Sequence, residues 1–433
     1  MADVNVAGQL DEIEKRIMAG LKDFQRATVN RIDELYRAGQ MRVLVSDEVG
    51  LGKTLIARGT IAKLAKLQKE SGDKLVKVVY VCSNASIAEQ NLNKLRITSE
   101  LKTESTSSSR LSMQHLNIFR QENDTEMLNR YIQLIPLTPD TSFRMTSGAG
   151  IVSERALMYA ILRRMPELSM YRKALEVAMA DKAVGQWDGW ARDWYETQVK
   201  ECDKTSGGKY LAYMLDKLSV ELNMRADEDN TVLDMIISMC KQIRSNRYKQ
   251  QNNNAVIGKL RVIFAKISLD KLEPDLVIMD EFQRFKYLIN SDSDTETGML
   301  ANKFFNSSKV RMLLLSATPY KMYSTLEEID ETQVDEHYSE FFDVMNFLNI
   351  SESEKAEFKT VWSDSVKLKE LSDGDTTVLS AKNAAEDAMY QHICRTERIS
   401  ASENADIIDD KDVAAPLSVM EQDIKSYVQA QKL

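Results

Sequence analysis

The sequence has 433 residues, of which 43% are hydrophobic, and its formal net charge at pH 7 is −9. Such a chain can bury two or three hydrophobic cores, and its acidic balance argues against a surface that coats nucleic acid non-specifically. No run approaches the roughly 18 apolar residues of a membrane helix, the first residues lack a signal-peptide pattern, and the four cysteines lack metal-ligand spacing. We therefore expect a cytoplasmic protein without a membrane contact or a zinc site.

The first predicted element is an amphipathic helix over residues 11–38. Leu21, Thr28 and Leu35 recur at intervals of seven residues, which places them on one helical face. Gln25 lies within this helix, where it could simply be an exposed polar residue.

A glycine-rich loop follows the apolar run 43–45. Residues 47–54 read Asp-Glu-Val-Gly-Leu-Gly-Lys-Thr and precede a helical pattern, which is the strand, loop and helix context of a phosphate-binding loop. Its glycines would let backbone N–H groups surround phosphates, Lys53 would reach the β and γ oxygens, and Thr54 would ligate Mg²⁺. A glycine-rich turn without this chemistry is the alternative. The predicted nucleotide contacts are Gly50, Leu51, Gly52, Lys53 and Thr54.

Two further strands are predicted before residue 150. The β-rich run 76–82 and the run 131–137 are continuously apolar or nearly so, as buried parallel strands are. Polar residues follow each run and could contact a phosphate backbone, although a turn without a ligand explains them equally well. The candidates are Ser83, Asn84, Thr138, Ser142 and Arg144.

A long, mostly helical segment over residues 151–270 follows, with 250–254 predicted as a loop because it is polar throughout. Trp187, Trp190 and Trp194 are spaced to fall on one helical face. We expect them to pack in a core, although stacking on bases is conceivable. The segment could also bind a partner protein.

Two acidic residues end the next predicted strand. The apolar run 275–279 leads into Asp280-Glu281-Phe282-Gln283, and open α/β sheets bind ligands at the carboxyl ends of their strands. Asp280 would hold Mg²⁺, while Glu281 would orient and deprotonate an attacking water. A solvated acidic strand end is the alternative. A last strand over 310–315 then stops at Ser316-Ala317-Thr318.

In order and spacing, these motifs resemble those of superfamily-two helicases and translocases. The phosphate loop has the form typical of Swi/Snf-like duplex-DNA translocases, Asp280–Gln283 resembles a DEAD/DEAH box, and Ser316 and Thr318 match the Ser-Ala-Thr motif that couples ATP state to nucleic-acid contact. Residues 21–25 are similar to the adenine-reading motif, in which Gln25 would pair with the base edge. The resemblance implies a RecA-like α/β lobe with a parallel sheet that uses ATP and Mg²⁺.

The family pattern also includes a second RecA-like lobe with an arginine finger in a Gln-x-x-Gly-Arg-x-x-Arg motif, and that motif does not occur in the 433 residues. Cys394–Arg398 resembles the arginine-rich segment that enters the second lobe of Swi/Snf-like proteins, or is a solvated basic turn. We expect a second lobe to act in cis or in trans. Around residues 137–143 and 315–323 the chain resembles large bacterial helicase-like proteins. Several of those belong to anti-phage defence or restriction-like systems, so this resemblance implies a defence role.

These patterns predict four segments. Residues 1–150 and 271–321 are expected to form the RecA-like lobe, 151–270 a helical insertion, and 322–433 a helical extension leading toward the second lobe. We expect an ATP-dependent translocase on nucleic acid, with double-stranded DNA favoured. The alternative is an ATP-gated protein-interaction module that does not translocate.

Overall fold

The computed structural model describes residues 2–73, 75–83, 85–101, 110–142, 150–225, 229–245, 250–285, 296–305, 310–317, 336–349, 351–368 and 376–396. Residues 1–396 form one compact unit. No helix among the described residues combines the length and the apolar character needed to cross a membrane.

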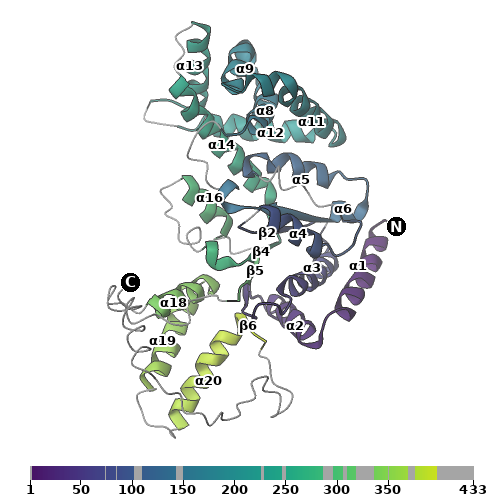
Figure 1. The fold of residues 1–433 in the computed structure, drawn as a ribbon, viewed down its shortest axis with the longest axis vertical. Coiled ribbons are helices and arrows are strands. Elements are labelled where there is room, and N and C mark those ends of the chain that lie inside the picture. The colour runs from purple at the N-terminus through teal and green to yellow at the C-terminus, as the bar shows by residue number, and fades with distance from the viewer. Residues whose placement is uncertain are drawn as a thin grey trace, which may run out of the picture. The chain divides into compact units, whose positions relative to one another are not determined.

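Within the described residues, six parallel strands form one sheet in the order β3-β2-β4-β5-β1-β6 (Figure 1). Each of the inner strands is short and almost wholly apolar, because both faces of the sheet are covered by helices. This confirms the predicted α/β fold of a RecA-like lobe with helical additions. The strands are β1 (Arg42–Val45), β2 (Val76–Val81), β3 (Ile132–Leu137), β4 (Leu276–Asp280), β5 (Arg311–Leu315) and β6 (Ile393–Cys394).

One face of the sheet is covered by helices from the N-terminal part of the chain. Val43, Val45, Val78 and Ile278 alternate along their strands and share a buried core with these helices, of which α3 contacts α1, α2 and α4 (Figure 1). The bounds are α1 (Ala2–Ala19), α2 (Asp23–Arg37), α3 (Lys53–Glu70), α4 (Ala85–Leu95) and α6 (Met127–Tyr131).

The other face carries the intervening side chains Leu44, Val79, Val277 and Leu314. They pack against the end of a long helix, α14 (Gln250–Leu272), and against later elements of the chain. These later elements are η5 (Phe282–Phe285), α16 (Glu296–Phe305), α18 (Glu336–Leu348), α19 (Glu352–Leu368) and α20 (Thr376–Tyr390).

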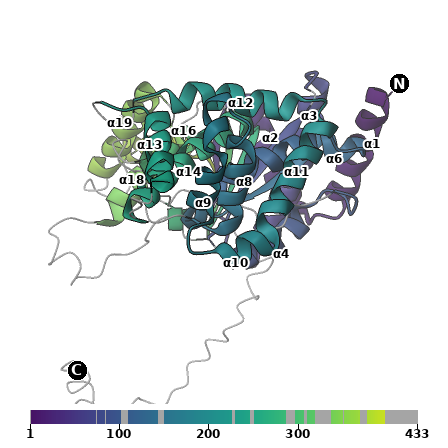
Figure 2. The same cartoon turned by 90° about the horizontal axis from the view of Figure 1, so that it is seen from above.

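The helices between β3 and β4 form a third core with α5 (Gln114–Glu122). Helix α8 contacts α9 and α11 in this core (Figure 2). Helix α14 belongs to the same core and also reaches the sheet, so it joins the helical segment to β4. The remaining elements are η2 (Leu111–Met113), α7 (Pro139–Ser142), α8 (Val152–Leu162), η3 (Pro166–Tyr171), α9 (Arg172–Ala180), α10 (Val184–Gln186), η4 (Trp187–Ala191), α11 (Arg192–Thr205), α12 (Lys209–Leu222) and α13 (Val232–Arg244).

Two local predictions were wrong. The single helix over 11–38 is two helices, because the chain turns at Gly20, and glycine commonly ends a helix. The polar run 250–254 is the first turn of α14 and not a loop, and Asn253 is fully buried within it. Tertiary packing overrides the weak helix propensity of asparagine there.

The three tryptophans do not share one environment. Trp187 is 1% exposed and lies in the core, whereas Trp190 and Trp194 are 48% and 56% exposed. The core prediction was therefore correct for the first and wrong for the other two. Residues Trp187–Ala191 form a π-helical turn, which rotates later side chains away from the face that α-helical spacing predicts.

Candidate active site

Three adjacent strands bring the sequence motifs to one edge of the sheet. β5 lies between β4 and β1, and Leu315 pairs in register with both Asp280 and Val45. The phosphate loop after β1, Ser316 after β5 and the acids ending β4 therefore meet at the carboxyl edge, where ligands bind in open α/β sheets.

Gly52 gives the phosphate loop its shape. It has a left-handed backbone with φ of 82° and immediately precedes α3, so the first backbone N–H groups of that helix face the loop. A Cβ atom at Gly52 would lie 2.5 Å from Nε2 of Gln25. Both the backbone angle and this close approach require glycine. A loop of this shape at a helix N-terminus fits a polyphosphate.

Gln25 is only 5% exposed, so it is not the exposed helix residue that was the alternative interpretation. Its Nε2 donates to the Leu51 carbonyl at 2.9 Å, and its Oε1 accepts from the Lys22 backbone N–H at 3.1 Å. The amide thus joins the start of α2 to the phosphate loop. Its pairing with an adenine edge stays a prediction.

Lys53 bends back over its own loop. Its Nζ donates to the carbonyl oxygens of Asp47 at 2.9 Å and Glu48 at 3.3 Å. These carbonyls hold the ammonium group beside the loop. Because carbonyl oxygens are neutral acceptors, a phosphate group would be a stronger partner for the same ammonium group.

Asp280 is held by two side chains that the sequence reading did not identify. Its Oδ2 accepts from the Tyr80 hydroxyl at 2.5 Å and from Asn91 Nδ2 at 3.2 Å. Burial raises the pKa of Asp280, and the Tyr80 hydrogen bond and the nearby Lys53 ammonium act in the opposite direction. Tyr80 lies in β2 beside β4, so only the strand order could have revealed it.

Glu281 occupies an unusual backbone conformation, with φ of 54°. Non-glycine residues rarely adopt this region, and such strain is often found at functional sites. Its Oε2 accepts from Gln283 Nε2 at 2.5 Å, and Oε1 of the same glutamine accepts from the Ser316 hydroxyl at 2.8 Å. Gln283 therefore connects the second acid of the box to the Ser-Ala-Thr motif.

Asp47 connects the phosphate loop to the far end of the described chain. This fully buried carboxylate accepts from the Thr396 backbone N–H at 2.7 Å through Oδ1, and β6 pairs with β1 immediately before that contact. Burial raises the pKa of Asp47, while the Thr396 hydrogen bonds and the Lys53 and Arg395 charges lower it. Cys394–Thr396 is thus part of the lobe, next to the phosphate loop.

Two of the predicted nucleic-acid contacts are buried side chains. Thr138 is 3% exposed and Ser142 is fully buried, while the Ser83 hydroxyl accepts from Arg284 at 3.4 Å. Contact of these residues with a phosphate backbone stays a prediction. Asn84, Arg144, Thr318 and Arg398 lie outside the described residues.

Comparison with known families places the phosphate loop in a helicase context. Residues 19–135 match the family described as "Type III restriction enzyme, res subunit", whose domain is the N-terminal lobe of helicase-like superfamily-two proteins. The match includes Gln25 and Lys53 but ends before the Asp280–Gln283 box. It supports an ATP hydrolase of the helicase type and does not single out the Swi/Snf-like branch. No curated protein matches the chain.

Proposed function

We propose that this chain is the ATP-binding lobe of a translocase that acts on double-stranded DNA. The helicase-like match supports the general activity. The contact that carries the proposal is the hydrogen-bonded chain from Glu281 through Gln283 to Ser316. This hydrogen-bonded chain connects Glu281, which is proposed to position water, with the motif that is proposed to sense nucleic acid. A motor requires such a connection between ATP hydrolysis and nucleic-acid contact.

The motifs and the geometry of the site support the following roles. Lys53 would exchange its loop carbonyls for phosphate oxygens, and Thr54 and Asp280 would hold Mg²⁺. Bound ATP would supply the phosphoryl group that is transferred to water. Glu281 would orient that water and accept its proton. Tyr80 and Asn91 keep the Asp280 carboxylate in place through its Oδ2.

We propose that DNA binds along the loops that follow β2 and β3. Hydroxyl, amide and guanidinium contacts to phosphates position a protein on DNA without reading its sequence. The proposed contacts are Ser83, Asn84, Thr138, Ser142 and Arg144, with Ser316 and Thr318 coupling them to the ATP site.

A second RecA-like lobe, in cis or in trans, would supply the arginine finger. Residues Cys394–Thr396 support this proposal, because this start of the arginine-rich segment lies beside the phosphate loop. We further propose that the 151–270 insertion binds a partner protein, and that the motor acts in the cytoplasm in defence against phage, which agrees with the restriction-enzyme family that part of it resembles.

Steady-state ATP hydrolysis tests this function. The chain alone should turn over ATP slowly, because an arginine finger contributes on the order of 10³–10⁵ in rate. Adding a second lobe should make hydrolysis dependent on duplex DNA, more than on single strands or RNA. The absence of any stimulation by nucleic acid would instead support the ATP-gated interaction module. Fast hydrolysis by residues 1–433 alone would show that a finger is present, with Arg395 as the first candidate.

A further inference from the structure

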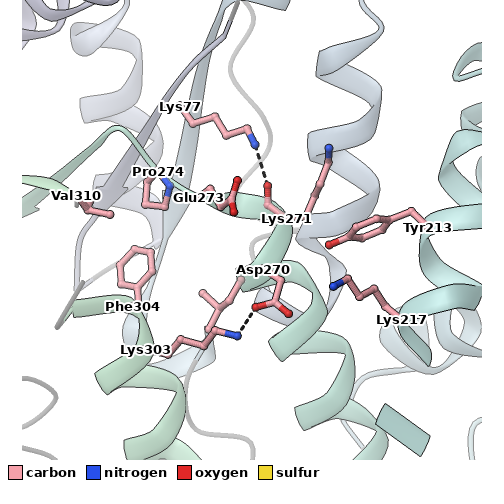
Figure 3. Close-up of a pocket in the computed structure, with 11 residues that line it drawn as sticks. Lys77, Tyr213, Lys217, Asp270, Lys271, Glu273, Pro274, Lys303, Phe304 and Val310 are labelled. Atoms are coloured by element: carbon pink, nitrogen blue, oxygen red, sulfur yellow. Dashed lines mark hydrogen bonds and ion pairs between the residues drawn. The ribbon is translucent and has the colours of Figure 1, made fainter. Parts of the chain in front are cut away.

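A cavity of about 830 Å³ opens on the edge of the sheet opposite the phosphate loop. Lys77 lies near the start of β2, and Pro274 and Val310 precede β4 and β5, so all three mark the amino ends of the strands. Helices α12, α14 and α16 supply the other walls (Figure 3). The cavity is thus bounded by both the RecA-like lobe and the helical segment between β3 and β4.

Four lysines and two carboxylates line this cavity, which gives it an excess of positive charge. Lys271 pairs with Glu122 at 2.8 Å and Lys303 pairs with Asp270. Lys217 has no ion pair among the described residues, and its Nζ lies 6.0 Å from the centre of the Tyr213 ring. Lys217 is therefore the cation most available to an anionic ligand.

Lys77 has a different role in the same cavity. It is 7% exposed, its Nζ donates to the Lys271 carbonyl at 2.8 Å, and it lies 3.6 Å from Glu122. Burial lowers the pKa of this lysine. These contacts fix the wall between β2 and α14, so the ligand charge must be met mainly by the other lysines.

Aromatic rings stand beside the charges. Tyr213 and Lys217 project from α12 toward Asp270 and Lys271 of α14, and the Phe304 ring lines the cavity from α16 (Figure 3). Burial and the nearby carboxylates raise the pKa of Tyr213 to about 12, so its hydroxyl remains a donor at neutral pH. A flat ring can pack on such side chains while its polar edge meets hydroxyl or carboxylate groups.

We propose that this cavity binds a small phosphorylated ligand with a flat ring, of the nucleotide class, at a site separate from the ATP site. Lys217 and Lys303 would contact the phosphates, because a lysine ammonium binds phosphate as a point charge. Tyr213 would pack on the ring, and Asp270 and Glu273 would accept from its amino or hydroxyl groups. The volume of about 830 Å³ suits a small molecule, rather than a continuous nucleic-acid strand.

The position of this cavity suggests a consequence of binding. Strand β4 begins two residues after Pro274 and ends at Asp280, so one short strand joins the cavity to the acids of the ATP site. A ligand that contacts α12, α14 and α16 together would fix the helical segment against this strand. Binding should therefore stabilise the whole unit against thermal unfolding.

Calorimetric titration of the full chain with ADP tests this proposal. In a Lys53→Ala background, which weakens the phosphate-loop site, one binding event should remain. Adding Lys217→Glu should weaken that event by tenfold or more, since one charge-assisted contact is replaced by repulsion. Lys209→Glu is the matched control, because Lys209 is an exposed lysine of the same helix that does not line the cavity.

The outcomes separate the possibilities. Loss of binding with Lys217→Glu but not with Lys209→Glu, in proteins with unchanged circular dichroism, supports the site. Absence of any residual ADP binding in the Lys53→Ala background overturns it, as does an equal effect of both glutamate variants. Pyrophosphate and adenosine, titrated separately, show whether phosphate or ring provides the affinity. Lys217-dependent binding of a single-stranded oligonucleotide without binding of ADP would also refute the proposal. None of these results depends on whether the chain hydrolyses ATP.

Discussion

The backbone N–H of Thr396 donates a hydrogen bond to the Asp47 carboxylate, 2.7 Å away and 349 residues earlier in the chain. Asp47 Oδ2 is buried and has no hydrogen-bond donor among the described residues, so the contacts with Thr396, together with the Lys53 and Arg395 charges, are what offset the burial of this carboxylate. The Thr28 and Thr396 hydroxyls also lie 3.4 Å apart. The first residue of the phosphate loop thus holds the segment that leads out of the lobe.

Replacing Asp47 should release that segment. Because a hydrogen bond to a charged group contributes about 1.5–3 kcal/mol, Asp47→Ala should accelerate amide hydrogen exchange at residues 393–396 by tenfold or more. Asp23→Ala, which removes a fully exposed carboxylate from the start of α2, should leave exchange there unchanged. Equal exchange in the Asp47 variant and the unmodified protein would show that the contact does not hold β6 in place.

Lys53 and Glu281 should differ in what they contribute. Lys53→Ala should weaken ATP binding, since the proposed role of the ammonium is to contact phosphate, whereas Glu281→Gln should keep Mg·ATP binding and slow hydrolysis, since the proposed role of its carboxylate is to act on water. Equilibrium binding of a fluorescent ATP analogue, together with single-turnover hydrolysis in the complete motor, measures the two effects separately. If both variants lost binding equally, Glu281 would not be the water-positioning residue.

The Gln283 amide should act together with Ser316. Each of Gln283→Ala and Ser316→Ala should reduce DNA-stimulated hydrolysis, and the double variant should be little worse than either single one, because both break the same hydrogen-bonded chain. The expected loss is about tenfold, corresponding to about 1.4 kcal/mol. ATP affinity should change little in all three. Additive losses would mean that the two side chains act independently.

Gly150 should be required for packing of the helical segment. Its φ is 68°, and a Cβ atom there would overlap Glu154 Oε2 and lie 2.7 Å from Arg261 Nε. These two side chains form a buried ion pair at 2.9 Å. Gly150→Ala should therefore lower the free energy of unfolding by about 3 kcal/mol or more, measured by urea denaturation.

Gly207→Ala is the control for this backbone effect. Gly207 has a similar φ of 64°, but no atom lies within 4 Å of the added Cβ. Gly207→Ala should therefore lower the free energy of unfolding by only about 1 kcal/mol. Equal losses in the two alanine variants would show that backbone strain alone explains the effect at Gly150.

His115 should make stability depend on pH. Burial lowers the pKa of this histidine to about 3, so the folded protein keeps it neutral while the unfolded chain protonates it near pH 6.5. The unfolded state therefore binds more protons between these values, and stability falls as pH falls below 6.5. Between pH 7 and pH 5 the loss should be about 2 kcal/mol.

The measurement is Tm at several pH values for the unmodified protein and for His115→Gln. Other titratable groups contribute equally to the pH dependence of Tm in the two proteins. The difference between the two curves of Tm against pH is therefore due to His115. The decrease in Tm toward pH 5 should be smaller in the variant. The same decrease in both proteins would contradict a neutral buried His115.

Local patterns predicted the strands and the motifs that follow them. Runs such as 43–45, 76–82 and 275–279 are apolar at nearly every position, so they could be recognised as buried strands without knowledge of their neighbours. Gly50 and Gly52 indicated a loop whose backbone could surround phosphates, also from local sequence, and in the structure both glycines have positive φ. The ends of helices and the exposure of single side chains were predicted less accurately, as the break at Gly20 and the exposure of Trp190 show.

The sequence by itself determined the α/β class, the phosphate loop and the pair of acids, because each of these depends on residues that are adjacent in the chain. Only the tertiary structure decided that Tyr80 and Asn91 hold Asp280, that Gln25 supports the loop at Leu51, and that Thr396 returns to Asp47. These contacts depend on the order of strands in the sheet. That order results from packing over the whole lobe, and no local spacing of residues encodes it.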